Sequence, residues 1–188
     1  MRQEAETRPV GSVYSLVMND LWDDNAFPMA YLITIRTFGT WLHGDERTSV
    51  DRHGKNIYRT QRMPANPRLQ SRMCENVANQ QFLLAGKQRA VVEDAITYVC
   101  EIRNYLLSAI NVRTNHAHVV IAAEAKPESI IIAFKSNATR ELRAAGLVDR
   151  DKTVWSRGGS RRYLWKPHHV AKAVDYVLNG QGDDLPDF

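Results

Sequence analysis

The chain has 188 residues, of which 44% are apolar and 24% are charged, as in an ordinary soluble globular domain. This length is enough for one domain with a hydrophobic core. The sequence shows no apolar run near the roughly 20 residues that cross a bilayer and no secretory signal, so we expect a cytoplasmic protein. Two cysteines are too few for a disulfide framework, and a net charge of +4 only weakly favours a polyanionic partner.

The chain is predicted to divide into a short extension and one domain. Residues 1–28 show no steady hydrophobic period and are predicted to be an N-terminal extension, either flexible or partly helical. Residues 29–188 are predicted to form a single domain. Its first strand is expected at 30–38, where β-branched and aromatic residues follow one another. The polar, basic stretch 43–68 is predicted to be a long loop, and long loops in compact domains are usually either functional or disordered.

The centre of the domain is predicted to contain two helices followed by two strands. Helical patterns cover 69–83 and 87–103, and the second places its apolar residues along one stripe. Two strands are expected at about 106–113 and 116–123. The few residues between them, Thr114 and Asn115, allow only a hairpin connection.

The last third of the chain is predicted to contain two helices around a short strand region. A helix is expected over 127–146, with a proline in its first turn and a glycine at its end. The segment 154–165 is expected to form two strand-like pieces joined by a tight turn at a double glycine. A final helix is expected over 167–180. This order predicts an α+β fold with a largely antiparallel sheet, for which a ferredoxin-like sandwich is the best match.

Two histidines stand at the start of a predicted strand, in the stretch NHAHVVI. His116 and His118 are two residues apart, so they point to one face of the strand, while Val119 and Ile121 point to the other. Two imidazoles at this spacing can converge on one divalent ion. Two protein ligands suit an open site that leaves room for substrate and water. The alternative is a pair of ordinary surface or partly buried histidines.

A tyrosine on the last predicted helix is the expected chemical partner of the histidines. The apolar stripe of this helix consists of Val170, Ala173, Val174, Val177 and Leu178. Tyr176 lies roughly 130° from the centre of that stripe on a helical wheel. It is therefore available for chemistry, although an exposed or edge-packed tyrosine would have the same position. Tyr163, in the preceding strand-like piece, is the rival candidate.

These two motifs together resemble the single-tyrosine (Y1) HUH transposases, in particular the REP-associated branch of the IS200-like superfamily. TNHAHVVI is followed by a helix with AVDYVLNGQG, and the intervening FKSNATRELRAAGL and VWSRGGSRRYLW are also similar to that group. The resemblance covers roughly residues 29–182. It implies a ferredoxin-like fold and a metal-dependent enzyme that cuts and rejoins single-stranded DNA near stem-loops. It also implies a cytoplasmic, nucleoid-associated protein.

The resemblance assigns roles to individual residues. His116 and His118 match the HUH pair that binds Mg²⁺ or Mn²⁺, and Tyr176 matches the nucleophile that forms a 5′-phosphotyrosine. The family commonly has an amide one helical turn after the tyrosine as a third metal ligand, and this chain has Gly180 there. Gln181 is the expected substitute, with Asn179 as the alternative.

The DNA is expected to bind to cations near aromatic side chains, since single-strand binders combine the two. The predicted DNA-binding residues are Arg36, Lys135, Arg140, Arg157, Arg161 and Arg162. The basic loop from Arg47 to Arg68 is a further candidate for the stem-loop. Members of the family often act as homodimers, which this sequence by itself does not establish.

Two other functions remain compatible with the sequence. The first is a domesticated module that binds a DNA or RNA hairpin without cutting it, and the departure at Gly180 favours this alternative. The second is a metal-dependent nuclease in which water replaces the tyrosine.

Overall fold

The structure is a computed structural model, and it describes residues 27–40, 49–50, 62–63, 66–68 and 81–182. Residues 1–26 of the predicted extension and nearly all of the helix predicted at 69–83 lie outside the described residues. Within the predicted long loop, a two-residue strand β2 (Ser49–Val50) pairs with β3 (Arg62–Met63) in antiparallel orientation.

A four-stranded sheet forms the centre of the fold. Its strands are β1 (Ala30–Arg36), β4 (Leu106–Val112), β5 (His116–Ala122) and β6 (Ser160–Leu164). They lie side by side in the order β4-β5-β1-β6, and every neighbouring pair is antiparallel. This is the strand order of a ferredoxin-like sandwich, so the predicted fold class is confirmed.

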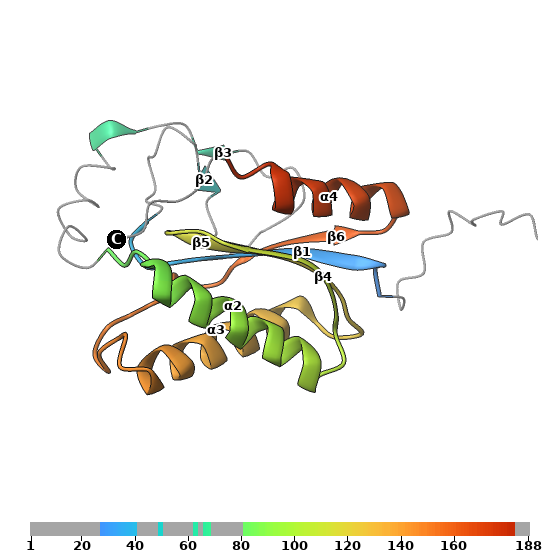
Figure 1. Ribbon diagram of the computed structural model, residues 1–188. Coiled ribbons are helices and arrows are strands. Elements are labelled where there is room, and N and C mark those ends of the chain that lie inside the picture. The colour runs from blue at the N-terminus through green and yellow to red at the C-terminus, as the bar shows by residue number, and fades with distance from the viewer. Residues whose placement is uncertain (1–26, 41–48, 51–61, 64–65, 69–80, 183–188) are drawn as a thin grey trace, which may run out of the picture.

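Helices cover both faces of the sheet. Helices α2 (Gly86–Ile102) and α3 (Pro127–Ala144) pack together against one face, and α4 (Pro167–Asn179) lies across the other (Figure 1). Strands expose alternate residues to opposite faces. In β1 the residues Tyr31 and Ile33 therefore enter the core beneath α2 and α3, while Leu32 faces α4.

The two faces have hydrophobic cores of different size. The larger core joins the sheet to α2 and α3. The smaller core lies under α4, where Ala173 and Val177 meet Val120, Ala30 and Leu164. The predicted apolar stripe of α4 included Leu178, but this residue is 55% exposed and does not belong to the core. The α4 core therefore ends one residue after Tyr176.

The two strand-like pieces predicted on either side of the double glycine are present, but they do not pair with each other as a tight turn would require. Trp155 bridges to Thr37 of the β1 edge, and β6 then pairs with the same strand from Ser160 onward. Trp155 is the partner of Thr37, and Ser160 is the partner of Thr34. Four residues lie between Trp155 and Ser160, but only two lie between Thr34 and Thr37. The extra residues therefore form a bulge in one continuous edge strand. Gly158 has a φ of 71°, a backbone conformation that glycine adopts without strain.

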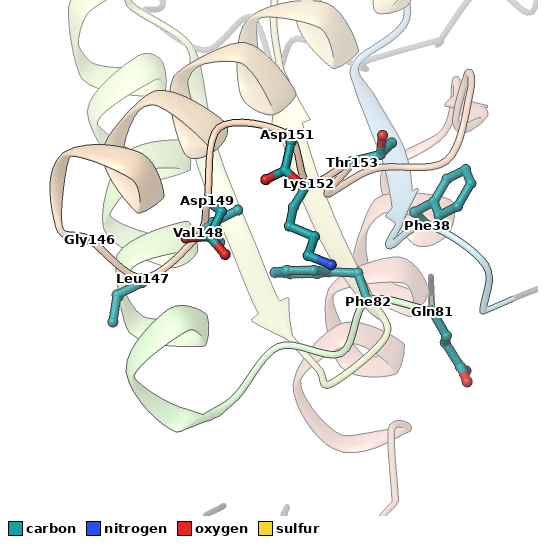
Figure 2. A pocket seen from close by; sticks show the side chains of 10 residues that line it. All are labelled: Phe38, Gln81, Phe82, Gly146, Leu147, Val148, Asp149, Asp151, Lys152 and Thr153. Carbon is teal, nitrogen blue, oxygen red and sulfur yellow. The ribbon is translucent and has the colours of Figure 1, made fainter. Parts of the chain in front are cut away.

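A hollow of about 540 Å³ lies between Phe38, Phe82 and the loop over residues 146–153 (Figure 2). Asp149, Asp151 and Lys152 give it a mixed charge. None of the residues predicted to bind metal or DNA lines it. It is therefore separate from the predicted histidine site.

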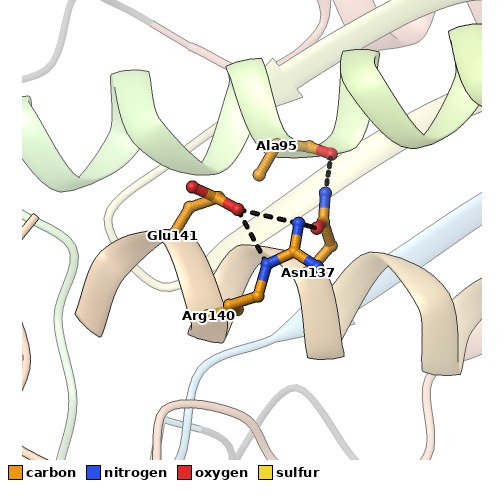
Figure 3. Close-up of polar contacts among 4 residues, drawn as sticks. All are labelled: Ala95, Asn137, Arg140 and Glu141. Carbon is orange, nitrogen blue, oxygen red and sulfur yellow. Dashed lines mark hydrogen bonds and ion pairs between the residues drawn. The ribbon is translucent and has the colours of Figure 1, made fainter. Parts of the chain in front are cut away.

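A buried amide joins the two helices on the larger core. Asn137 of α3 is almost fully buried, and its Nδ2 donates a hydrogen bond of 2.8 Å to the Ala95 carbonyl of α2 (Figure 3). Its Oδ1 accepts a hydrogen bond from Arg140. The side chain is satisfied at both ends, as a buried amide must be to avoid a desolvation penalty.

We expect Asn137→Ala to lower the free energy of unfolding by about 1–3 kcal/mol, because it removes both bonds and leaves a small cavity. Urea unfolding followed by circular dichroism measures this change. Ser136→Ala, one residue away and exposed, is the control and should change stability by less than about 0.5 kcal/mol. Equal stability of the two variants would contradict the inter-helix role of Asn137.

Candidate active site

Strand register brings both histidines to the face that α4 covers. In the pairing of β5 with β1, His118 is opposite Thr34 and His116 is opposite Arg36. In the pairing with β4, His118 is also opposite Asn111. Side chains opposite one another share a face of the sheet. The ring centroids of the two histidines are 4.5 Å apart, so the predicted pair forms one compact site.

His118 is buried and held by one hydrogen bond. Its Nδ1 is 2.7 Å from Oγ1 of Thr34. Burial is the largest cause that lowers the pKa of His118 from 6.5 to about 4, and His116 and Arg36 lower it further. The imidazole is therefore neutral near pH 7, which is the form that binds metals. When Nδ1 donates to Thr34, Nε2 is left as the nitrogen with a free lone pair.

His116 lies between two amide side chains. Its Nδ1 is 2.6 Å from Oδ1 of Asn115, and its Nε2 is 3.3 Å from Oε1 of Gln181. The Nε2 of Gln181 donates to the Tyr176 carbonyl, which fixes the orientation of this amide. If Nδ1 carries the proton, two acceptors face each other at Nε2 and Oε1, an arrangement that a cation stabilises. Adjacent ligands of an octahedral ion lie about 3 Å apart, so the spacing fits Mg²⁺ or Mn²⁺.

Tyr176 stands beside the histidines. Its ring centroid is 5.4 Å from that of His118, and its side chain is 45% exposed, so substrate can reach the hydroxyl. The residues predicted as nucleophile and metal ligands therefore meet at one place on the sheet. Asn179, the alternative ligand, instead donates to Asp175 at 2.8 Å. Of the two amides predicted as the third ligand, Gln181 is thus the one that lies next to the histidine pair.

The glycine at position 180 has a steric reason. A Cβ at this position would lie 2.9 Å from the Tyr176 carbonyl oxygen and 3.0 Å from Cδ2 of its ring. Any side chain there would displace the helix end or the tyrosine. Since α4 ends at this glycine, the next residue is free to turn back over the sheet, which places Gln181 near His116.

A second amide fixes the end of α4. The Nδ2 of Asn111 donates a hydrogen bond of 2.9 Å to the Val177 carbonyl. The last four carbonyls of a helix have no partner within the helix, and a side chain that binds one of them stabilises the last turn. Asn111 lies next to His118 in the sheet. It therefore connects the histidine strand to the residue that follows Tyr176.

The rival tyrosine lies on the opposite side of the sheet. Tyr163 pairs with Tyr31 in the strand register, and Tyr31 belongs to the core beneath α2 and α3. The two rings are in edge contact, with centroids 5.3 Å apart. Tyr163 consequently faces away from the histidine pair.

The predicted DNA-binding cations are divided between the two faces. Arg36 and Arg162 belong to strand positions on the histidine face, and Arg157 is exposed in the edge bulge. The other three lie on the face of α2 and α3, and each has a partner there. Lys135 donates to backbone carbonyls of the bulge, Arg140 binds Glu141, and Arg161 pairs with Glu128 at 3.0 Å.

Sequence patterns did not identify three residues that hold the site: Thr34, Asn111 and Asn115. In the sequence, Asn115 is recognisable only as a turn residue. Thr34 and Asn111 interrupt apolar strands with a polar side chain on the histidine face, which is the signal that could have revealed them. The partner of Thr34 depends on strand register and the partner of Asn111 on how α4 docks on the sheet, and a single sequence gives neither.

Comparisons with known proteins gave similarity in structure alone. No protein-family profile matches the chain, and no curated protein does. One similar solved structure is a REP-associated tyrosine transposase bound to a REP hairpin, with a TM-score of 0.47, 14% identity and coverage of 85% of this chain and 70% of that one. Another is a proposed transposase from Deinococcus radiodurans R1, with a TM-score of 0.42, 11% identity and coverage of 87% and 98%. Since both TM-scores are below 0.5, the functional assignment depends on this chain's own residues.

The described residues limit the kinds of site that are present. Among them, no group of three His, Cys, Asp or Glu side chains could hold a metal ion. A third protein ligand from this part of the chain would be of another type, as Gln181 is. No helix in the described ranges is long and apolar enough to span a membrane.

We expect Thr34→Val to lower the free energy of unfolding by about 1–3 kcal/mol. Valine has nearly the same shape, so the change leaves a buried ring nitrogen of His118 without its partner. Urea denaturation measures the difference. Thr153→Val, at an exposed position, is the matched control. If both variants unfold alike, the hydroxyl does not hold the imidazole.

Asn111→Ala should loosen the last turn of α4. The Val177 carbonyl loses its donor, so amide hydrogen exchange at Gly180, which bonds to the Tyr176 carbonyl, is expected to become about 5- to 10-fold faster. NMR-detected exchange gives the rate at this single amide. Ser108→Ala on the same strand is the control. Unchanged protection in Asn111→Ala would show that the helix end is held by other contacts.

Proposed function

We propose that this protein is a Y1-type HUH transposase of the REP-associated kind. It would cleave and rejoin single-stranded DNA near stem-loops through a 5′-phosphotyrosine at Tyr176. One observation supports this most strongly: Tyr176, His118, His116 and Gln181 lie in one continuous row of neighbouring side chains, although they come from β5 and from the end of α4. The sequence resemblance assigns these residues complementary roles.

The metal would be held by Nε2 of His118, Nε2 of His116 and Oε1 of Gln181. Thr34 and Asn115 bind the other nitrogens of the two imidazoles, which orients the rings. Such an ion, Mg²⁺ or Mn²⁺, would neutralise charge on the scissile phosphate. Three protein ligands leave the remaining positions of an octahedral ion for phosphate oxygens and water.

The bonds made and broken in the covalent step belong to the tyrosine and the DNA. The Tyr176 oxygen attacks the phosphorus, a new O–P bond forms, and the bond from phosphorus to the 3′ oxygen breaks. The phenolic proton is lost to solvent or to a nearby base, and the leaving 3′ oxygen takes up a proton. The phosphodiester energy is retained in the phosphotyrosine, so a 3′-hydroxyl can reverse the step and join the strand without ATP.

The charges around the site support a DNA substrate. Arg36 and Arg162 on the histidine face, with Arg157 at the edge, would hold the phosphates of the strand that enters. The stem-loop preference and the possibility of a homodimer come from the resemblance.

Tyr176→Phe should abolish covalent product, because phenylalanine lacks the attacking oxygen. His116→Ala should reduce the product at least about 100-fold by removing a metal ligand. The measurement is a denaturing gel of purified protein with labelled single-stranded stem-loop DNAs and Mn²⁺. Tyr163→Phe is the matched control and should react like the original protein, since Tyr163 faces the other side of the sheet.

The same gel separates the competing functions. Cleavage that persists in Tyr176→Phe would indicate a nuclease that uses water. If the protein binds the stem-loop DNAs but forms neither adduct nor cleavage product with any of them, it would be a hairpin-binding module. The presence of Gly180 where the family commonly has an amide favours this alternative. Either result would contradict the transposase proposal.

A further inference from the structure

A chain of hydroxyl groups lies behind the histidine pair, at the point where β1 ends. Thr37 directly follows β1 and is completely buried, and Thr40 is nearly so. Thr37 lies one position beyond the pair of Arg36 with His116, which ends the ladder between β1 and β5. This register places Thr37 beside Asn115, the residue that precedes His116 in the hairpin.

Thr37 by itself satisfies the backbone carbonyl of Asn115. Its backbone N–H donates to that oxygen at 3.0 Å, and its Oγ1 donates to the same oxygen at 3.1 Å. A backbone carbonyl oxygen has two lone pairs, and here one residue binds both. The backbone of the hairpin turn is therefore fixed to the end of β1 just before His116.

Two further hydroxyls hold Thr37 in place. The Oγ1 of Thr40 donates to the Thr37 carbonyl at 2.9 Å, and the Oγ of Ser156 donates to it at 2.8 Å. The Oγ1 of Thr40 also lies 3.4 Å from the Asn115 carbonyl, but a hydroxyl has one proton, which favours the nearer acceptor. Thr37 is thus supported from the turn after β1 and from the segment before β6.

The side chain of Asn115 extends this order to His116. Its Oδ1 is 2.6 Å from Nδ1 of His116. An amide oxygen can only accept a hydrogen bond, so Nδ1 carries the proton and the lone pair of the neutral ring lies on Nε2. Nε2 is the nitrogen that faces Gln181, where the metal is proposed to bind. This contact therefore selects the tautomer that can act as a ligand there.

His116 needs such support more than His118 does. His118 lies within the ladders on both sides of β5, is buried, and is held by Thr34. His116 is the first residue of β5, directly after the hairpin turn. The ends of strands open at a lower free energy than their centres. A support for the turn thus acts on the more mobile of the two proposed ligands.

We infer that Thr37 is a positioning residue of the proposed metal site, an inference that rests on the proposed function. It acts through Asn115, because it fixes the backbone of the residue whose amide holds the ring of His116. Outer partners of metal-binding histidines set the tautomer and the orientation of the ring. Loss of the Thr37 hydroxyl would release the turn, and His116 would spend part of its time in the tautomer that does not bind a metal through Nε2.

The test is Mn²⁺ binding by the full chain in the absence of DNA, measured by EPR from the signal of the free ion. Thr37→Val keeps the shape and the backbone N–H but removes the hydroxyl. We expect it to bind Mn²⁺ about five-fold more weakly, the equivalent of one net hydrogen bond. Asn115→Ala removes the direct partner of His116 and should weaken binding at least about ten-fold. Thr37→Ser keeps the hydroxyl and should stay within about two-fold of the parent.

Two controls separate positioning from general stability. In the Asn115→Ala background, Thr37→Val should not weaken Mn²⁺ binding further, because the effect of Thr37 passes through that side chain. Asn137→Ala removes buried hydrogen bonds between α2 and α3, away from the histidines, and should bind Mn²⁺ like the parent.

NMR of the ring nitrogens reports the tautomer of His116 directly in the metal-free protein. At about pH 8 an unperturbed imidazole is neutral, so the ¹⁵N shifts distinguish the two tautomers. The parent and Thr37→Ser should show the proton on Nδ1. Thr37→Val and Asn115→Ala should show a mixture of both forms.

Five results would overturn the inference. They are parent-like Mn²⁺ affinity in Thr37→Val, the same loss in Thr37→Ser or in Asn137→Ala, additive losses in the double variant, an unchanged tautomer in Thr37→Val, and no Mn²⁺ binding by the parent. Adduct formation on stem-loop DNA reports separately on the proposed function. The expected Thr37 effects without any adduct would keep the positioning role and reject the transposase, whereas an adduct with unchanged Mn²⁺ affinity in Thr37→Val would do the reverse.

Discussion

The register of three neighbouring strands is the constraint on which the site depends. His118 lies in a row across the sheet between Thr34 of β1 and Asn111 of β4. Side chains alternate between faces, so a slip of one residue would turn both histidines into the core beneath α2 and α3. The apolar residues between and after the histidines prevent this slip, because Ala117, Val119 and Ile121 are completely buried on that core.

The same register explains how a single helix can complete the site. The small core beneath α4 is enough to hold the helix on the sheet, and it ends near Val177. At that point Asn111 binds the backbone of the helix and Gly180 ends it. The tyrosine is thus held at the boundary between a packed face and an open one, and Gln181 folds over His116. The core beneath α4, the helix end at Gly180 and the amides of Asn111 and Gln181 together create a partly open site.

Much of this arrangement could be predicted from the sequence. The run of β-branched and aromatic residues in β1 and the helical periods of α2 and α4 identified these elements to within a few residues. Alternation in β5 gave the face of His116 and His118, and the period of α4 gave the face of Tyr176. The double glycine between two strand-like pieces was misleading, because it predicted a tight turn. A tight turn and a wide bulge share this sequence signal, and the choice depended on the unoccupied edge of β1.

Other features depend on contacts between distant segments. Thr34 acquires its role from the pairing of β1 with β5, which are far apart in the chain, and Asn111 acquires its role from the docking of α4 against β4. Arg143 and Arg150 meet in a cleft only because the loop after α3 folds back on that helix. Position in the sequence likewise does not show that Lys135 and Arg140 lie on the face opposite His116. The residue types are visible in the sequence, and only the folded chain gives their partners.

The most direct test of the central claim is the mass of the peptide that carries the DNA. After reaction with a stem-loop substrate, nuclease treatment and trypsin digestion, the peptide that follows Lys172 contains Tyr176 as its only tyrosine. Trypsin does not cut before Pro167, so Tyr163 falls in a separate peptide that ends at Lys172. The account predicts added nucleotide mass on the peptide with Tyr176 alone. Nucleotide mass on the peptide with Tyr163, or on neither peptide, would contradict it.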